Sequence, residues 1–237
     1  FIGGYVTKYL AMEHEIWCAI RKQSDTVRLE GLPCNLFYIE EETSLYKEVE
    51  KIKPEVLVHL AGVFYGEHNQ NSIFDLLDSN VRFPTVLFDA AYSAGCRKFI
   101  NTGSCLQNYQ GEKYNPVNLY AATKQAAEDI LLYYVNAKRC KAITLQIFDS
   151  YGPGDTRNKV LNIVSRLHDG DSIDMSEGKQ KMYLCYVEDI AKAYVQTVIL
   201  LEKMEMGTYK KYAVRDELPI TLKEIINTYL RISGKQI

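Results

Sequence analysis

The first 148 residues alternate short apolar runs with longer amphipathic segments. Residues 55–60 (Glu-Val-Leu-Val-His-Leu) form an apolar run of the kind found in buried strands. Residues 72–94 have helical spacing and are followed by Gly95, a common helix-ending residue. The same pattern predicts further strands at 15–21, 36–39, 98–101 and 142–148, with the 98–101 run followed by a turn at 102–104, and further helices at 5–12, 44–52 and 120–137.

This alternation is typical of βαβ units, so it predicts an α/β fold in which a doubly wound parallel sheet carries helices on both faces. The regular alternation of strand and helix patterns ends at Tyr151-Gly152-Pro153-Gly154-Asp155, whose glycines and proline are typical of a loop. We therefore expect a first domain at 1–150 and a smaller lobe at 151–237. Within the second part, we expect helices at 160–167, 187–202 and 221–232 and strands at 183–186 and 209–214. Helix 187–202 is expected to pack back on the first domain. Thr221 and Glu224 are expected to form a capping box at the start of the last helix.

Composition narrows the class of protein without identifying it. The chain has 237 residues, of which 47% are hydrophobic and 24% charged, and its net charge is −2. This profile predicts a soluble globular protein, and it gives no support for nucleic acid or an acidic membrane as a partner. No apolar run is long enough to cross a bilayer. The six cysteines and four histidines are scattered without metal-ligand spacing, so we expect no metal site, reduced thiols and a cytoplasmic location.

The pair Tyr120 and Lys124 is the strongest candidate for chemistry. On a helix, residues four apart lie on one face about one turn from each other. A free tyrosine titrates near pH ~10, and a neighbouring cation favours the phenolate and lowers the pKa of the phenol. The spacing therefore predicts a general acid/base that works near neutral pH.

Several short motifs lie in an order that resembles the extended short-chain dehydrogenase/reductase family, also called the NAD-dependent epimerase/dehydratase family. The resemblance spans essentially the whole chain. It implies a Rossmann fold with a substrate-binding C-terminal lobe, and enzymes that act on nucleotide-linked sugars. The motifs are Phe1-Ile2-Gly3, His59-Leu60-Ala61-Gly62, Asn80-Val81, Ser104, Tyr120 with Lys124, Tyr151-Gly152-Pro153 and Val187-Glu188-Asp189.

The resemblance implies roles for individual residues. Tyr120 would exchange a proton with a sugar oxygen, Ser104 would bind that oxygen, and Lys124 would lower the pKa of Tyr120 and bind the cofactor. The implied catalytic residues are thus Ser104, Tyr120 and Lys124. Those implied to bind the cofactor are Gly3, Leu60, Ala61, Gly62, Asn80, Tyr120, Lys124 and Phe148, and those implied to bind substrate are Ser104, Asp149 and Asn158.

Arg21 ends the second strand of such a fold, where the adenosine ribose is recognised. An acidic residue there selects NAD, whereas an arginine accommodates the 2′-phosphate of NADP, so Arg21 favours NADP(H) over NAD(H). Cys105-Leu106 follows Ser104 in place of the Asp-Glu pair of the family's dehydratases, which disfavours a 4,6-dehydratase.

The short segment from Ser104 to Tyr120 and the run at 151–159 are similar to those of CDP-abequose synthase-like 4-ketoreductases. The resemblance thus implies NADPH-dependent reduction of a 4-keto group on a nucleotide-linked deoxysugar, as in polysaccharide biosynthesis. An NAD-dependent nucleotide-sugar epimerase and a non-catalytic NADP-binding regulator on the same fold are the alternatives.

Three positions depart from the family's pattern, one of them Met182, where the family has an arginine that reaches the nucleotide phosphates. The arginine of its L-R-x-x-N motif is Gln146 here, and the asparagine is Asp149. The chain also begins at Phe1, inside the family's phosphate-binding loop. We therefore expect a first strand and two glycines to precede this sequence, further residues to follow it, and the chain as given to bind NADP(H) weakly or not at all. The resemblance further implies a homodimer that packs helices 72–94 and 120–137 against a second copy.

Overall fold

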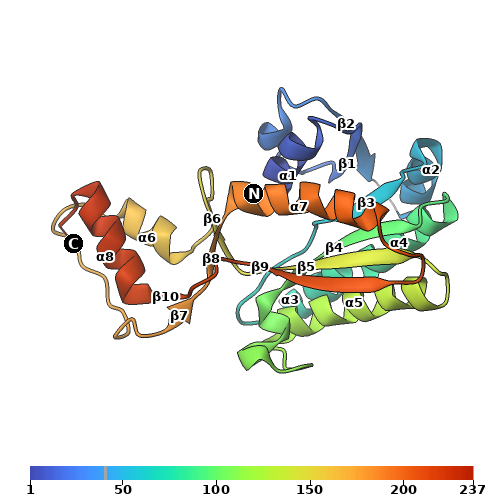
Figure 1. Ribbon diagram of the computed structural model, residues 1–237. Helices are drawn as coiled ribbons and strands as arrows, with labels where there is room; N and C mark the ends of the chain where they lie inside the picture. Colours follow the sequence, from blue (N-terminus) through green and yellow to red (C-terminus); the bar gives the residue numbers. More distant parts are fainter. Residues whose placement is uncertain (40–41, 237) are drawn as a thin grey trace.

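The computed structural model describes residues 1–39 and 42–236, and its centre is a parallel sheet (Figure 1). The strand order β3-β4-β5-β9 is parallel throughout. Two further strands, β1 and β2, pair in parallel as a separate sheet. The bounds are β1 Ile16–Arg21, β2 Cys34–Ile39, β3 Val56–His59, β4 Lys98–Ser104, β5 Lys141–Ile147 and β9 Tyr209–Val214.

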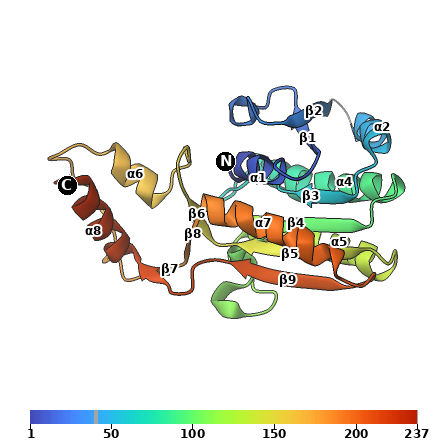
Figure 2. The ribbon, with the colours of Figure 1, turned by 45° about the horizontal axis from the view of Figure 1, so that its top comes forward.

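Helices cover both faces of this sheet (Figures 1 and 2). Successive residues of a strand point to opposite faces, so one strand supplies two cores. In β4, Ile100 packs with Ile143 and with Tyr194 of α7, whereas Phe99 packs with Phe88 of α4. The fold is therefore the doubly wound α/β arrangement that the sequence predicts. The first face carries α1 (Ile2–Leu10) and α7 (Val187–Glu202), and the second carries α2 (Glu42–Ile52), α4 (Phe83–Ser93) and α5 (Leu119–Asn136).

The helix expected at 72–94 is interrupted. It divides into α3 (Gln70–Leu77), a π-helical turn η2 (Asp78–Arg82) and α4. Asn80, in the π turn, is fully buried, and its side chain bonds to groups outside the helix. A π turn carries one extra residue, and this one brings Asn80 to the edge of the sheet where the candidate site lies.

The turn expected at Thr102-Gly103-Ser104 is wrong, because β4 continues through Ser104. All three residues pair with β5, from Thr102 opposite Leu145 to Ser104 opposite Ile147. The strand ends instead at three 3₁₀ residues, η3 (Cys105–Gln107). The other short helical turns are η1 (Val27–Leu29) and η4 (Tyr109–Gly111).

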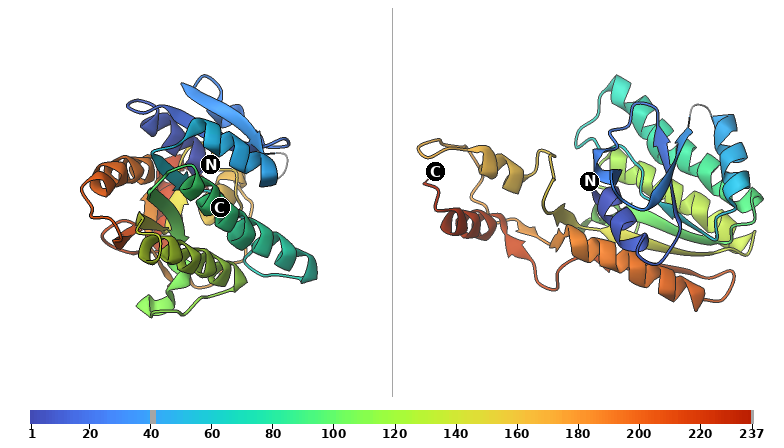
Figure 3. Two further views of the ribbon diagram at one scale, coloured as in Figure 1. Left: turned by 90° about the vertical axis from the view of Figure 1, so that its right-hand side faces the viewer. Right: turned by 90° about the horizontal axis from the view of Figure 1, so that it is seen from above.

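A smaller unit extends away from the main sheet at the level of β6 and β8 (Figure 3). Its last helix begins with the predicted capping box between Thr221 and Glu224. The chain returns from this unit to the main body twice, because α7 packs beside α1 and β9 pairs with β5. Residues 151–237 are therefore not one continuous lobe. The unit contains β6 (Asp149–Tyr151), α6 (Val160–Arg166), β7 (Lys181–Met182), β8 (Leu184–Tyr186), β10 (Ile220–Thr221) and α8 (Leu222–Ser233).

No helix within the described ranges is both long and apolar enough to cross a membrane.

Candidate active site

The carboxyl ends of β3, β4 and β5 meet at one edge of the sheet, where ligands bind in folds of this type. Ser104 is the last residue of β4 and is 8% exposed. Its hydroxyl oxygen accepts a hydrogen bond from the backbone N–H of Leu106 at 3.3 Å, which caps the 3₁₀ turn that follows. Capping a short turn in this way fixes the serine side chain at the strand end.

Tyr120 lies in the first turn of α5. The helix begins at Asn118, whose side-chain oxygen accepts from the N–H of Ala121 at 3.0 Å and whose amide donates to the carbonyl of Gly66 at 3.2 Å. The Phe64 ring packs edge-on against the Tyr120 ring at 4.8 Å between centroids. The cap and the aromatic contact together hold the phenol at the edge of the sheet.

The pKa of Tyr120 shifts in the direction opposite to the one that the sequence predicted. Burial raises the pKa of Tyr120, and the Ser104 hydroxyl and the Arg157 charge act in the opposite sense without reversing it. Lys124 is not among the groups that lower it. Lys124 is itself 3% exposed, and burial lowers the pKa of its ammonium to about 8, with Glu128 acting against that shift. The phenol is therefore protonated at neutral pH, which suits a proton donor.

Lys124, Gly62 and Asn80 come together beside Tyr120. A Cβ added at Gly62 would lie 3.1 Å from Asn80 Oδ1 and 3.8 Å from Lys124 Nζ. The Asn80 amide is already occupied, because it donates to the Val63 carbonyl and to Thr123 Oγ1 and accepts from the Val63 N–H. Asn80 thus holds the loop after β3 against α5, and the absence of a side chain at Gly62 permits this close packing next to Lys124.

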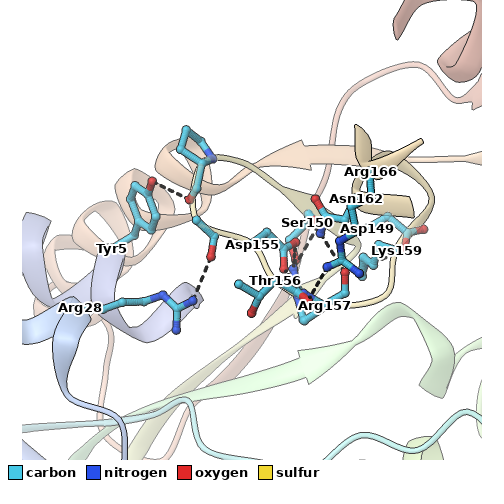
Figure 4. A network of polar contacts seen from close by, with 12 residues as sticks. Tyr5, Arg28, Asp149, Ser150, Asp155, Thr156, Arg157, Lys159, Asn162 and Arg166 are labelled. Atoms are coloured by element: carbon cyan, nitrogen blue, oxygen red, sulfur yellow. Dashed lines mark hydrogen bonds and ion pairs between the residues drawn. The ribbon is translucent and has the colours of Figure 1, made fainter. Parts of the chain in front are cut away.

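An arginine that the sequence analysis did not single out lies in the loop between β6 and α6 (Figure 4). Arg157 donates to both carboxylate oxygens of Asp155 at 2.7 Å and to Ser150 Oγ at 2.9 Å, and its guanidinium lies 4.8 Å from the centre of the Phe1 ring. Its charge also reaches Tyr120. The signal in the sequence that could have identified Arg157 was a basic residue in the loop after the strand expected at 142–148.

The same loop is tied to the start of the chain (Figure 4). Tyr5 donates from its hydroxyl to the Pro153 carbonyl at 3.0 Å, and Arg28 donates to the Gly154 carbonyl at 2.9 Å. Gly3 lies in the first turn of α1, with nothing within 4 Å of where a side chain would begin. The first turn of α1 and the loop that carries Arg157 therefore lie next to each other.

The remaining candidates lie on several other elements. Arg21 is exposed at the end of β1, in the separate two-stranded sheet. The Phe148 ring packs against Tyr183 at 5.6 Å. Asp149 pairs with Lys159 at 3.2 Å, and exposed Asn158 accepts from Arg166 at 3.1 Å. Leu60 and Ala61 lie in the loop that directly follows β3.

These residues fit a dinucleotide. The free N–H groups of a helix's first turn, the side-chain-free position at Gly3 and the nearby guanidinium groups of Arg28 and Arg157 suit a pyrophosphate. The backbone at Gly62, which packs closely on Asn80 and Lys124 without a side chain, suits close approach of a ring or ribose. Within 1–39 and 42–236, no group of three or more His, Cys, Asp or Glu side chains is arranged to hold a metal ion.

Comparison with known proteins agrees with this geometry. Residues 1–213 match the model of the NAD dependent epimerase/dehydratase family. The chain belongs to this family. The predicted Rossmann fold is confirmed, and the family consists of NAD-dependent enzymes that modify nucleotide sugars, as the resemblance implied.

Individual relatives lie at low identity. CDP-abequose synthase of Yersinia pseudotuberculosis is 25% identical over 233 residues, which are 95% of this chain and 79% of the relative. CDP-abequose synthase of Salmonella typhimurium is 29% identical over 72% of this chain and 56% of the relative. UDP-glucose 4-epimerase from Brucella ovis, solved in complex with NAD, superposes with a TM-score of 0.85 at 21% identity, covering all of this chain and 81% of that one.

Proposed function

We propose that this chain reduces a 4-keto group on a nucleotide-linked deoxysugar with NADPH. The observation that carries the proposal is the Tyr120 phenol facing the Ser104 hydroxyl at the carboxyl edge of the sheet, where burial raises the pKa of the phenol. A reduction needs a proton donor at the carbonyl oxygen, and burial keeps the phenol in its donor form. The similarity to two CDP-abequose synthases supports the same reaction class.

The nicotinamide cofactor supplies the hydride when it is bound. As the carbonyl carbon gains its new C–H bond, negative charge develops on the carbonyl oxygen. The Ser104 hydroxyl holds that oxygen, and Tyr120 transfers its phenolic proton to it, so that the ketone becomes an alcohol. The phenolate left behind is stabilised by the Ser104 hydroxyl and the Arg157 cation until it takes a proton from solvent.

The roles of the other residues in this proposal follow their positions. Gly3, Leu60, Ala61, Gly62, Asn80, Lys124 and Phe148 would line the cofactor site, and Arg21 would meet the 2′-phosphate that distinguishes NADP(H) from NAD(H). The unit built from α6, β7, β10 and α8 would bind the nucleotide sugar, together with Asp149 and Asn158. The working protein would be a cytoplasmic homodimer.

The test combines turnover with binding. The purified protein is assayed for NADPH oxidation with CDP- and dTDP-linked 4-keto-6-deoxy sugars, and calorimetry compares NADPH with NADH in the absence of substrate. Reduced sugar and tighter binding of NADPH are expected. Product from neither sugar, together with epimerisation of a UDP-hexose, would refute the proposal.

An NAD-dependent nucleotide-sugar epimerase is the second candidate. The likeness of the fold to a UDP-glucose 4-epimerase with bound NAD favours it. Epimerases of this kind recycle a tightly held cofactor, so NAD that survives purification would support this candidate over the reductase.

A further inference from the structure

The backbone of Ser104 is held by two glutamine side chains that the proposed chemistry does not use. Its N–H donates to Gln107 Oε1 at 2.8 Å, and its carbonyl accepts from Gln146 Nε2 at 3.0 Å. Gln107 is fully buried. Gly103 makes this approach possible, because a Cβ there would lie 2.9 Å from Gln107 Oε1. Both backbone polar groups of Ser104 are thus fixed by side chains.

Gln107 connects Ser104 to the helix that carries Tyr120 and Lys124. Its amide nitrogen donates to Glu128 Oε2 at 3.0 Å. Glu128 is 4% exposed and lies on α5 one turn beyond Lys124, which is one turn beyond Tyr120. At four-residue spacing the three side chains share one face of the helix.

Lys211 of β9 neutralises Glu128 and closes a ring. Its ammonium pairs with Glu128 Oε1 at 2.9 Å and donates to Asn108 Oδ1 at 3.4 Å, and Asn108 Oδ1 also accepts from Gln146 Nε2 at 2.8 Å. The hydrogen bonds therefore run from Ser104 through Gln107, Glu128, Lys211, Asn108 and Gln146 back to Ser104. The ring joins β4, η3, α5, β9 and β5.

We infer that Gln107 and Glu128 are positioning residues that set Ser104 in register with Tyr120 and Lys124 for proton transfer. The inference rests on the proposed function. A buried ion pair gains little stability over apolar residues of the same size, because both charges lose their hydration. The ion pair and its hydrogen bonds do fix geometry, because each hydrogen bond sets the position of one atom relative to another. Misplacing a reacting group by about 1 Å can cost about 100-fold in rate.

The structure offers an exchange test. In Gln107→Glu, a carboxylate faces the Glu128 carboxylate, so the ring opens between η3 and α5. We expect kcat to fall by about 10- to 100-fold while KM changes less than about threefold, because Asp149, Asn158 and the smaller unit, which are proposed to bind the nucleotide sugar, are unchanged. In the double variant Gln107→Glu/Glu128→Gln an amide again faces a carboxylate, and the carboxylate introduced at position 107 still accepts from the Ser104 N–H. This variant should recover at least about tenfold in kcat over the single Gln107→Glu change.

Gln125→Ala is the matched control. Gln125 accepts a second hydrogen bond from the Gln107 amide at 3.0 Å, but it lies outside the ring. This variant should keep kcat within about twofold of wild type. If Gln107→Glu does not fold, as judged by circular dichroism, Gln107→Met removes all three hydrogen bonds of this side chain at nearly constant volume and should show at least the same loss of kcat.

A second measurement needs no substrate. Lys124 is titrated by NMR with 13Cε-labelled lysine, and its signal is assigned with Lys124→Met. The groups that face Lys124 are Glu128 and Tyr120 on α5 and, from β3, His59, which is neutral because burial lowers its pKa to about 3. Glu128→Gln should lower the pKa of Lys124, whereas Gln125→Ala should leave it in place.

The outcomes separate the two proposals. A wild-type protein that reduces neither sugar and epimerises a UDP-hexose refutes the proposed function, and an unmoved Lys124 titration in Glu128→Gln then refutes the coupling of Glu128 to the site as well. An active wild type with unchanged kcat in the Gln107 variants, or an exchange variant without recovery, overturns the positioning role.

Discussion

At the scale of single residues, Tyr120 and Lys124 share one helix face, and burial acts on both. It raises the pKa of the phenol and lowers the pKa of the ammonium to about 8. In each case burial favours the uncharged form, because a low-dielectric surrounding penalises charge. Sequence spacing identifies the pair correctly but gives no information on depth, and depth decides the direction of both shifts.

Replacing the phenol tests its role as proton donor. Tyr120→Phe keeps the ring that packs against Phe64 but removes the only transferable proton of that side chain, so NADPH binding should stay within about threefold while kcat falls by about 100- to 10,000-fold. Calorimetry and steady-state kinetics measure the two effects. Tyr38→Phe, on exposed β2, is the control and should retain wild-type kcat. A Tyr120→Phe enzyme with normal turnover would remove Tyr120 from the mechanism.

Burial of the Lys124 ammonium should also make the free energy of unfolding depend on pH. Lys124 has a pKa near 8 when folded and 10.5 as the reference value, so the unfolded chain binds the extra proton between these two pH values. Burying the charged ammonium therefore destabilises the folded state in full below pH 8, and this cost disappears as the pH rises toward 10.5. Lys124→Met should be more stable than wild type at pH 7 by up to about 3 kcal/mol, and this advantage should shrink by about pH 10.

Urea unfolding at about pH 7 and about pH 10 measures this difference. Lys47→Met, at an exposed position of α2, is the control and should shift the free energy of unfolding equally at both pH values. A constant difference between Lys124→Met and wild type would contradict the burial of a charged Lys124.

At the scale of elements, most segments with a clear period were predictable, whereas three of the shortest strands and the break in the helix expected at 72–94 were not. The strand at 209–214 has its predicted bounds, and the last helix has its predicted capping box. β6, β7 and β10 have two or three residues each, too few for a period to show. The π turn at Asp78–Arg82 depends on where Asn80 finds partners, which local sequence does not record.

The same contrast holds within the site. Ser104 and Tyr120 can be identified from the sequence, because each lies in a short recognisable motif. Gln107, Glu128 and Lys211 come from three separate segments, and only the packing of α5 and β9 against β4 and β5 brings them together.

The loop between β6 and α6 offers a comparison at this scale. A Cβ at Gly152, where φ is +152°, would lie 2.5 Å from Val187 Cγ1, whereas Gly154, where φ is +76°, has open space. Gly152→Ala should therefore lose about 1–3 kcal/mol beyond the backbone strain that both substitutions cause, and it should lower kcat because the Arg157 loop shifts away from α7. Urea unfolding of Gly152→Ala and Gly154→Ala gives the difference, and equal losses would contradict the close packing at Val187.

At the scale of the whole molecule, α3 leaves large apolar side chains uncovered. Phe74 is 70% exposed and Leu77 is 45% exposed. Exposed apolar surface on neighbouring helices commonly marks a protein interface. The proposed homodimer would cover these side chains with α3 and α5 of a second copy.

Light scattering tests the dimer directly. The wild-type chain should have twice the mass of one copy, and Phe74→Glu should shift it toward the monomer, because a charge at that position would lose its hydration in the interface. Leu218→Glu is the control, since Leu218 is 77% exposed in the loop before β10 and should leave the mass unchanged. A wild-type monomer at micromolar concentration would refute the dimer.

The pairing of β5 with β9 has a consequence for biosynthesis. Ile147 pairs with Val214, and most of the smaller unit and all of α7 are made between them. At a synthesis rate of about 5–20 residues per second, the edge of β5 waits several seconds for its neighbour. During that time an apolar strand with unpaired backbone groups is open to chaperones and to other nascent chains. Lys211, on β9, arrives with that last strand, so the hydrogen-bonded ring behind Ser104 closes only when the sheet is complete.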